Sequence, residues 1–348
     1  MNSKTAGLII AGGQNASRAT PSDGYGFIAK GWIVANFDRG IKAIHIDMND
    51  FPFHVPTLKM LSDSADVYLR WTSEWPDIYE SLMAERLSKA KLSVFRRLSR
   101  KKHRIAENRY LIEGWHLLGE CLEAKARLLA VIYDPSRSLS EEDEKALLAA
   151  KDRAEEIYLA SDDQLRAIGE TVTSAGVVGV VASEEEDWEL LADKLSRIEC
   201  GCVLALDEVS DPGNCGTIIR SGDWFGSAAI LLGDGCPSKE NGKVLRASMG
   251  GVFHLPIAEC PSLESRLLEL QASGFRIIVA SLEAQASELG GFVWPEKSLL
   301  VIGNEARGVR PSILELADSL LSIPKFGEGE SLNAAMAASV LLANWRIH

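Results

Sequence analysis

The sequence predicts an α/β protein: a C-terminal domain with a mainly parallel sheet and helices on both faces, preceded by a smaller α/β domain. One observation is length, because 348 residues suffice for two domains and an extension. A second is the regular alternation of short apolar runs with amphipathic runs after residue 200. The third is that these apolar runs are apolar throughout, as strands covered on both faces are.

Residues 1–78 are assigned to an N-terminal extension of unknown role. Short strands are expected at Gly7–Ala11 and Ile41–Ile46, with turn residues between them. The opening GLIIAGGQNASR, residues 7–18, resembles the phosphate loop of sugar nucleotidyltransferases, although Arg18 comes one residue late and residues 1–78 are too few to hold that domain. A nucleotide-handling role of the extension therefore stays open beside a purely structural one.

A basic segment opens the smaller domain, which is expected at residues 83–183. The segment from Ala84 to Tyr110 contains ten Lys and Arg residues and two Glu, which gives it a net charge of +8 in a chain of net charge −12. Such segregation indicates a surface for a polyanion such as nucleic acid, and a solvated helix face is the plainer alternative. The residues expected to bind RNA are Arg96, Arg97, Arg100, Lys101, Lys102 and Arg104.

The rest of the chain alternates strands with helices. The smaller domain has expected strands at Arg109–Gly114, Leu128–Tyr133 and Gly176–Ala182. Residues 184–199 are charged and typical of a linker helix, and residues 200–348 form the larger domain. Its expected strands are Cys202–Leu206, Ala228–Leu232, Val252–Ile257, Phe275–Ala280, Leu299–Gly303 and Leu320–Ile323. Its expected helices are 215–225, 239–248, 262–273, 311–318 and 331–346.

Three of these strands run into polar, glycine-containing loops, and ligands of open α/β sheets bind where such loops meet. The first strand ends in an acidic pair and a turn, after which Asn214 can cap a helix that carries Arg220 on its polar edge. The polar groups of the three loops are Asn214, Arg220, Asn304, Glu305, Ser331 and Asn333. Singly, each has a plainer role, such as a helix cap for Asn214 or Ser331 or a surface ion pair for Arg220. Spacing alone therefore predicts a pocket and no reaction.

Several classes of protein are disfavoured. The six cysteines have no C-x-x-C spacing and no accompanying His cluster, so we expect no metal, no disulfide framework and a cytoplasmic location. No apolar run approaches the roughly 18 residues of a membrane span, so no membrane partner is expected. The glycine fingerprints of dinucleotide sites and P-loops, and the G-x-S-x-G of hydrolases, do not occur after any strand.

The three loops resemble the three motifs of the SpoU (TrmH-type) RNA ribose methyltransferases of the SPOUT superfamily. The motifs are DPGNCGTIIRSGDWFG with Asn214, Gly216 and Arg220, then LVIGNEARG, then IPKFGEGESLNAAMAASVLL. The segment KVLRASMGGVFHLPI also resembles this family, and KKHR, NRYLIEG and GVVGVVAS resemble its ribosomal-protein-like substrate-binding domain. The resemblance covers about residues 83–348.

This resemblance implies S-adenosylmethionine as methyl donor, a trefoil knot, a homodimer and 2′-O-methylation of structured RNA, with ribosomal RNA favoured over transfer RNA. A transfer RNA methyltransferase and a catalytically silent RNA-binding assembly factor are the alternatives. The implied donor-binding residues are Gly303, Asn304, Ile323 and Leu332. The implied catalytic residues are Asn214, Arg220, Glu305, Ser331 and Asn333.

Chemistry constrains the role of the arginine. A guanidinium is effectively never deprotonated in proteins, so Arg220 is expected to hold the ribose or a phosphate and not to act as the base. Glu305 is expected to orient Arg220, with Asn214 or Ser331 at the hydroxyl. Ala306 stands where the family usually has Gly, and this change removes no polar group.

Overall fold

The computed structural model divides the chain into two compact units, Met1–Glu85 and Arg86–His348. In the first unit it describes the backbone of five strands, and beyond residue 83 it describes residues 84–171, 173–283 and 285–347. The five strands pair with their neighbours in chain order, each pair antiparallel. They are β1 (Leu8–Ala11), β2 (Lys30–Phe37), β3 (Gly40–Asp47), β4 (Thr57–Ser62) and β5 (Ala65–Arg70). The nucleotidyltransferase-like loop at residues 12–18 lies outside the described residues.

The second unit begins with a mixed five-stranded sheet in the order β6-β9-β8-β10-β7. Its strands are β6 (Glu85–Arg86), β7 (Arg109–Glu113), β8 (Leu128–Tyr133), β9 (Glu156–Leu159) and β10 (Val177–Ala182). The helices around it are α2 (Lys89–Arg97), α3 (Lys101–Glu107), α4 (Trp115–Glu123), α5 (Glu141–Arg153) and α6 (Asp162–Ile168). The basic segment is therefore two helices, because Leu98 is buried and Arg100 leaves the helical conformation.

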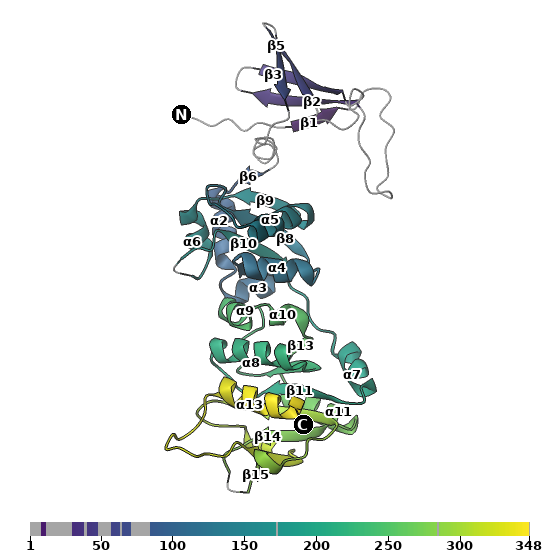
Figure 1. Ribbon diagram of the computed structural model, residues 1–348, viewed down its shortest axis with the longest axis vertical. Coiled ribbons are helices and arrows are strands. Elements are labelled where there is room, and N and C mark those ends of the chain that lie inside the picture. The colour runs from purple at the N-terminus through teal and green to yellow at the C-terminus, as the bar shows by residue number, and fades with distance from the viewer. Residues whose placement is uncertain are drawn as a thin grey trace. The chain divides into compact units, whose positions relative to one another are not determined.

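After α7 (Trp188–Arg197) comes a seven-stranded sheet in the order β13-β12-β11-β16-β14-β17-β15 (Figure 1). Every pair in it is parallel, which confirms the mainly parallel sheet. The strands are β11 (Gly201–Leu206), β12 (Ala229–Gly233), β13 (Ile257–Cys260), β14 (Arg276–Ala280), β15 (Ser287–Glu288), β16 (Lys297–Ile302) and β17 (Ser319–Ser322). The helices are α8 (Pro212–Phe225), α9 (Gly242–Ser248), α10 (Gly251–His254), α11 (Leu263–Ala272), α12 (Pro311–Leu314) and α13 (Ala334–Ile347), with a 3-10 turn at Leu289–Gly291.

Helices cover both faces of this sheet, as the apolar strands predict. Leu204 and Leu206 of β11 pack in a core that also contains residues of α8 and α13. Val203 and Ala205, on the opposite face of the same strand, pack with residues of α7, α11 and α12. Two separate hydrophobic cores therefore hold the sheet, and polar groups are left to the ends of its strands.

The strand predicted at Val252–Ile257 is wrong except at its last residue. Residues 251–254 form helix α10, and the strand begins only at Ile257. Met249 and Gly250 both adopt left-handed backbone conformations, which end α9 and turn the chain into α10. Phe253 packs against the core of the smaller domain, and Val252 packs against that core and against the core around β11, although neither lies in the sheet.

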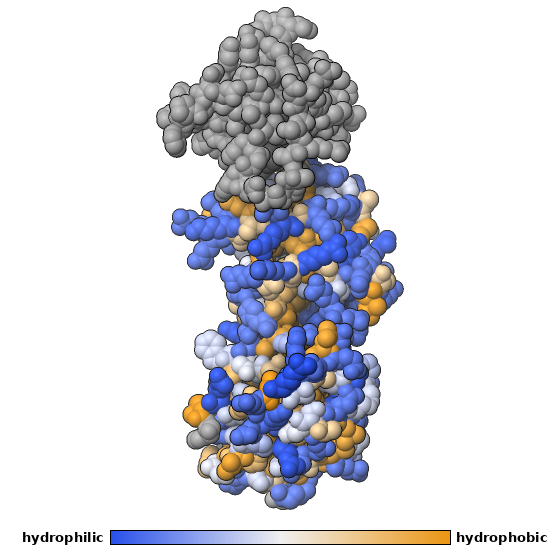
Figure 2. All heavy atoms as spheres, turned by 90° about the vertical axis from the view of Figure 1, so that its right-hand side faces the viewer, coloured by the Kyte–Doolittle hydropathy of each residue, from blue (hydrophilic) through white to orange (hydrophobic). Residues whose placement is uncertain are grey.

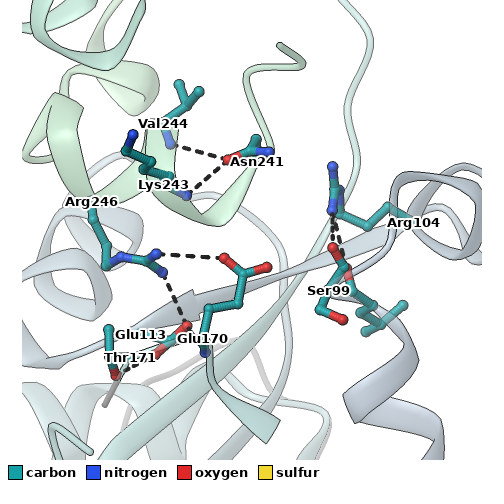
Figure 3. Close-up of polar contacts among 10 residues, drawn as sticks. Ser99, Arg104, Glu113, Glu170, Thr171, Asn241, Lys243, Val244 and Arg246 are labelled. Carbon is teal, nitrogen blue, oxygen red and sulfur yellow. Dashed lines mark hydrogen bonds and ion pairs between the residues drawn. The ribbon is translucent and has the colours of Figure 1, made fainter. Parts of the chain in front are cut away.

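Polar contacts join the smaller domain to the larger one (Figure 3). The Arg246 guanidinium on α9 contacts Glu113 at 3.2 Å and Glu170 at 3.5 Å. His254 of α10 lies 2.7 Å from Glu120 of α4 through Nε2 and 3.0 Å from Asp223 of α8 through Nδ1. We call these contacts the interdomain joint.

The surface facing the viewer in Figure 2 is mostly hydrophilic, with hydrophobic side chains in small separate patches. Among the described residues, no helix is long and apolar enough to cross a membrane.

Candidate active site

The site lies at the carboxyl edge of the parallel sheet, where three loops begin. β11 and β16 are neighbours, and Leu206 pairs with Ile302, so the loops after both strands start side by side. The third loop follows β17 and leads into α13. Parallel strands end at one edge, and this topology brings together residues that are about 90 and 120 positions apart.

The loop after β16 is a tight turn, which we call the 303–308 turn. The amides of Asn304 and Gly308 each donate to the other residue's carbonyl, at 3.0 and 2.9 Å. The Asn304 side-chain oxygen accepts from the amides of Ala306 and Arg307. A Cβ on Gly303 would lie 2.4 Å from the Gly308 carbonyl carbon, so only glycine permits this closed backbone.

A chain of hydrogen bonds links the three loops. Asn214 donates from Nδ2 to Glu305 Oε1 at 2.7 Å and accepts from Nδ2 of Asn333 at 2.9 Å. The Asn333 side-chain oxygen accepts from the amides of Ala335 and Met336 at the start of α13. Each amide therefore has a fixed orientation, and Glu305 is the acceptor at the end of the chain.

The helix caps differ from the expected ones. Asp211, and not Asn214, caps α8 by accepting from the Asn214 amide at 2.9 Å. Asn333, and not Ser331, accepts from the first amides of α13. The side chain of Asn214 is thereby left for the site, and Ser331 is exposed without a hydrogen-bond partner among the described residues.

Arg220 does not meet Glu305 as expected. It is exposed on α8 and makes no hydrogen bond or ion pair with any residue that the structure describes. Glu305 bonds Asn214 in its place, because Asn214 stands in the first turn of α8, beside the 303–308 turn. Leu332 is exposed, whereas Ile323 packs against the core around β11.

One carboxyl group and one thiol close to the site have shifted pKa values. The hydrogen bond from Lys243, and then the Asn214 amide, hold the pKa of Asp211 below its usual value. Burial raises the pKa of the Cys215 thiol, which lies in the core under α8. Cys215 is therefore a neutral core residue and not a nucleophile.

Two acidic residues at the end of β11 contact the 303–308 turn or the residue that follows it by two positions, although sequence reasoning gave them no role. Asp207 is 0% exposed and accepts from both the amide and Nε of Arg310. The backbone carbonyl oxygen of Glu208 accepts a hydrogen bond from the side-chain amide of Asn304. Their only signal in the sequence is an acidic pair directly after an apolar strand.

One of the six side chains predicted to bind RNA is not on the surface. Five of the six predicted RNA-binding side chains are exposed and form no ion pair within the described part of the chain: Arg96, Arg97, Arg100, Lys101 and Lys102. Arg104 is only 4% exposed, and its guanidinium donates to the carbonyls of Leu98 and Ser99 (Figure 3). Arg104 thus closes the end of α2, and its charge is not presented to solvent.

Comparison with known proteins assigns the class. Residues 201–343 match the SpoU rRNA Methylase family, and residues 89–179 match the MRM3-like substrate binding domain. The 23S rRNA (guanosine(2553)-2'-O)-methyltransferase RlmP of Bacillus subtilis is 33% identical over 256 residues, which are 74% of this chain and 96% of that protein. RlmB of Neisseria meningitidis, a 23S rRNA (guanosine-2'-O-)-methyltransferase, is 28% identical over 69% of this chain and 95% of its own.

Solved structures agree with the sequence comparison. An AdoMet-bound rRNA methyltransferase from Sinorhizobium meliloti superposes with a TM-score of 0.67 at 26% identity, over 76% of this chain and 97% of that one. The SpoU methyltransferase AviRb from Streptomyces viridochromogenes, in complex with AdoMet, has a TM-score of 0.66 at 26% identity, over 74% and 97%. Fold and loops thus define a SpoU-type methyltransferase. The chain belongs to the SpoU rRNA methylase family and is an RNA 2′-O-ribose methyltransferase.

Proposed function

We propose that this protein transfers a methyl group from S-adenosylmethionine to a ribose 2′-OH of ribosomal RNA. The observation that carries the proposal is the hydrogen-bonded chain of Glu305, Asn214 and Asn333, which joins all three family loops at one edge of the sheet. The similar proteins named above act on 23S rRNA, which supports ribosomal over transfer RNA.

The donor is proposed to lie against the backbone of the second and third loops. Gly303, Asn304, Ile323 and Leu332 are the residues that would hold it, within a trefoil knot as the family resemblance implies. The residues present fit a positively charged ligand, because the loops carry the carboxylates of Glu305, Glu328 and Glu330, which favour a cation. When bound, S-adenosylmethionine supplies an electrophilic methyl group on a positively charged sulfur.

The acceptor side is proposed to consist of Asn214, Arg220, Glu305, Ser331 and Asn333. Arg220 is free to hold a phosphate or the ribose and to stabilise negative charge that develops on the 2′ oxygen. Glu305 orients Asn214 in place of Arg220, and the exposed Ser331 hydroxyl is available to the 2′-OH. Most of the acceleration would come from holding the hydroxyl oxygen in line with the methyl–sulfur bond.

RNA is proposed to dock on α2 and α3. The five exposed cations of this surface can neutralise phosphates, while the domain around them supplies shape selection. The proposed domain boundaries stay at 1–78, 83–183, 184–199 and 200–348, and the two matched family regions lie within the second and fourth of these.

A homodimer through α8 and α13 is also proposed. These helices lie side by side, with the hydroxyls of Ser221 and Ser339 2.8 Å apart. They present exposed Trp224, Met336 and Val340, and Trp224 is 83% exposed. A second copy of the chain would cover such exposed apolar side chains. Sedimentation of the wild type and of Trp224→Glu tests the homodimer, because the variant should be monomeric.

Mapping 2′-O-methyl groups in total RNA from cells with and without this gene tests the function. One ribosomal RNA position should lose its methyl group, and purified protein with S-adenosylmethionine should restore it. Loss of a 2′-O-methyl group in transfer RNA would show that transfer RNA, and not ribosomal RNA, is the substrate. RNA binding without any donor binding in calorimetry would show a silent assembly factor and overturn the proposal.

A further inference from the structure

We infer that the acidic pair Asp207–Glu208 is a clamp that sets the conformation of the 303–308 turn, and that both are positioning residues for the methyl donor. This inference rests on the proposed function, which places the donor against that turn. Neither residue touches the proposed reaction site, and both act through the turn.

The first contact of the clamp is an ion pair in which the carboxylate is buried and the arginine is partly exposed. Asp207 is fully buried, and its two oxygens accept from the Arg310 amide at 2.8 Å and from Arg310 Nε at 2.6 Å. Arg310 is the second residue after the turn and stands immediately before α12. A buried carboxylate needs such partners, so the path of the chain leaving the turn is fixed by Asp207.

The second and third contacts come from Glu208. Its carbonyl oxygen accepts from the Asn304 side chain at 2.8 Å, and its carboxylate lies 2.6 Å from Arg307. Glu208 has a left-handed backbone, with φ of 56°, which turns its carbonyl and side chain toward the turn. The entry, the middle and the exit of the turn are thus each tied to the end of β11.

The clamp matters because the methyl donor is proposed to lie against the backbone of this turn. Backbone groups bind well when they are held in place before the ligand arrives, and a loop that must be ordered on binding loses affinity. The Glu264 carboxylate contacts the terminal nitrogen Nη1 of Arg310 and accepts a hydrogen bond from the Ser312 hydroxyl, but it bonds no atom of the turn. Glu264 is therefore the natural control for loss of an Arg310 partner alone.

The test measures the Kd of S-adenosylmethionine for the full chain by calorimetry. Asp207→Asn keeps the shape of the side chain but places its N–H group against the N–H groups of Arg310. The affinity for S-adenosylmethionine should therefore fall at least about tenfold. Glu208→Gly keeps the left-handed backbone and its carbonyl, so the expected loss is smaller, about two- to fivefold. Glu264→Gln should leave the Kd within about twofold of wild type.

A general loss of stability is separated by Ser161→Ala, which removes the capping box of α6 in the other domain. It should lower the melting temperature without changing the donor Kd. If folded Asp207→Asn binds the donor as the wild type does, the clamp is overturned. If Asp207→Asn does not fold, Glu208→Gly and Arg310→Lys decide: wild-type Kd in both refutes the clamp, and weaker binding supports it. A wild type that binds no donor contradicts the proposed function instead.

Discussion

At the scale of single residues, the site depends on which groups can donate and which can only accept. Asn214 uses both ends of its side-chain amide: it donates a hydrogen bond to Glu305 and accepts one from Asn333. Arg220 can only donate and makes no bond within the described residues, so its five N–H groups are available to the substrate. This division suits a reaction in which negative charge grows on an oxygen.

The role of Arg220 is testable by Arg220→Lys. Lysine keeps the charge but loses the planar fork, so kcat/KM should fall by about 100-fold, the order of magnitude for loss of one transition-state donor. The Kd of S-adenosylmethionine should not change, and Arg197→Lys on the exposed face of α7 is the control. Near-normal rates with unchanged pH dependence would exclude both the fork and a proton-accepting arginine.

At the scale of elements, α8 depends on its cap. Asp211 accepts from the Asn214 amide and pairs with Lys243 at 3.0 Å. Asp211→Ala should lower the free energy of unfolding by about 1 kcal/mol, measured in urea, because a helix cap is lost. The pKa of Asp211 is depressed, so its contribution is present above the ordinary value of 3.8 and is lost as the pH falls through the folded pKa. A pH-independent difference between the two proteins would contradict this account.

The helices α2 and α3 make a separate prediction. Replacing Arg100 and Lys101 together by Glu should weaken RNA binding and reduce its salt dependence, by about one unit of slope for each phosphate that the variant no longer neutralises. Donor affinity should be unaffected. Replacing Arg104 should instead lower stability, because its buried guanidinium closes α2. Equal loss of RNA affinity from Arg197→Glu would mean that net charge alone matters.

Most elements could be predicted because their signals are local. The apolar run of β11 and the helical spacing of α8 each lie within one stretch of sequence. The α10 segment could not be predicted, since Phe253, and in part Val252, pack on the core of the other domain. Within the site, the family motifs grouped Asn214, Glu305 and Asn333, whereas no motif assigned a role to Asp207 or to its partner Arg310.

At the scale of the molecule, the interdomain joint connects the smaller domain to the domain of the parallel sheet. Arg246 reaches Glu113 and Glu170, and His254 lies between two carboxylates from different domains. Leu245 of α9 completes the joint by packing into the core of the smaller domain. The domain that matches the substrate-binding family is thereby held against the domain that contains the site. Under the proposed function, this contact fixes the distance from docked RNA to the methyl donor.

The joint should weaken as the pH rises. Both ring nitrogens of His254 face carboxylates, Asp223 and Glu120, so the doubly protonated ring is the favoured form. The hydrogen bond to Asp223, and then the remaining charges, raise the pKa of His254 above its ordinary value of 6.5. A raised folded pKa means that the stabilisation is complete below pH 6.5 and is lost as the pH rises through the folded pKa.

His254→Gln should therefore unfold at lower urea than wild type near pH 6, and the difference should shrink as the pH approaches about 9. His103→Gln is the matched control, since His103 lies on α3 without an ion pair among the described residues. Its unfolding midpoint should follow that of the wild type at every pH. A His254→Gln deficit that grows with pH would reverse the sign and show that neutral histidine is the form that the joint holds.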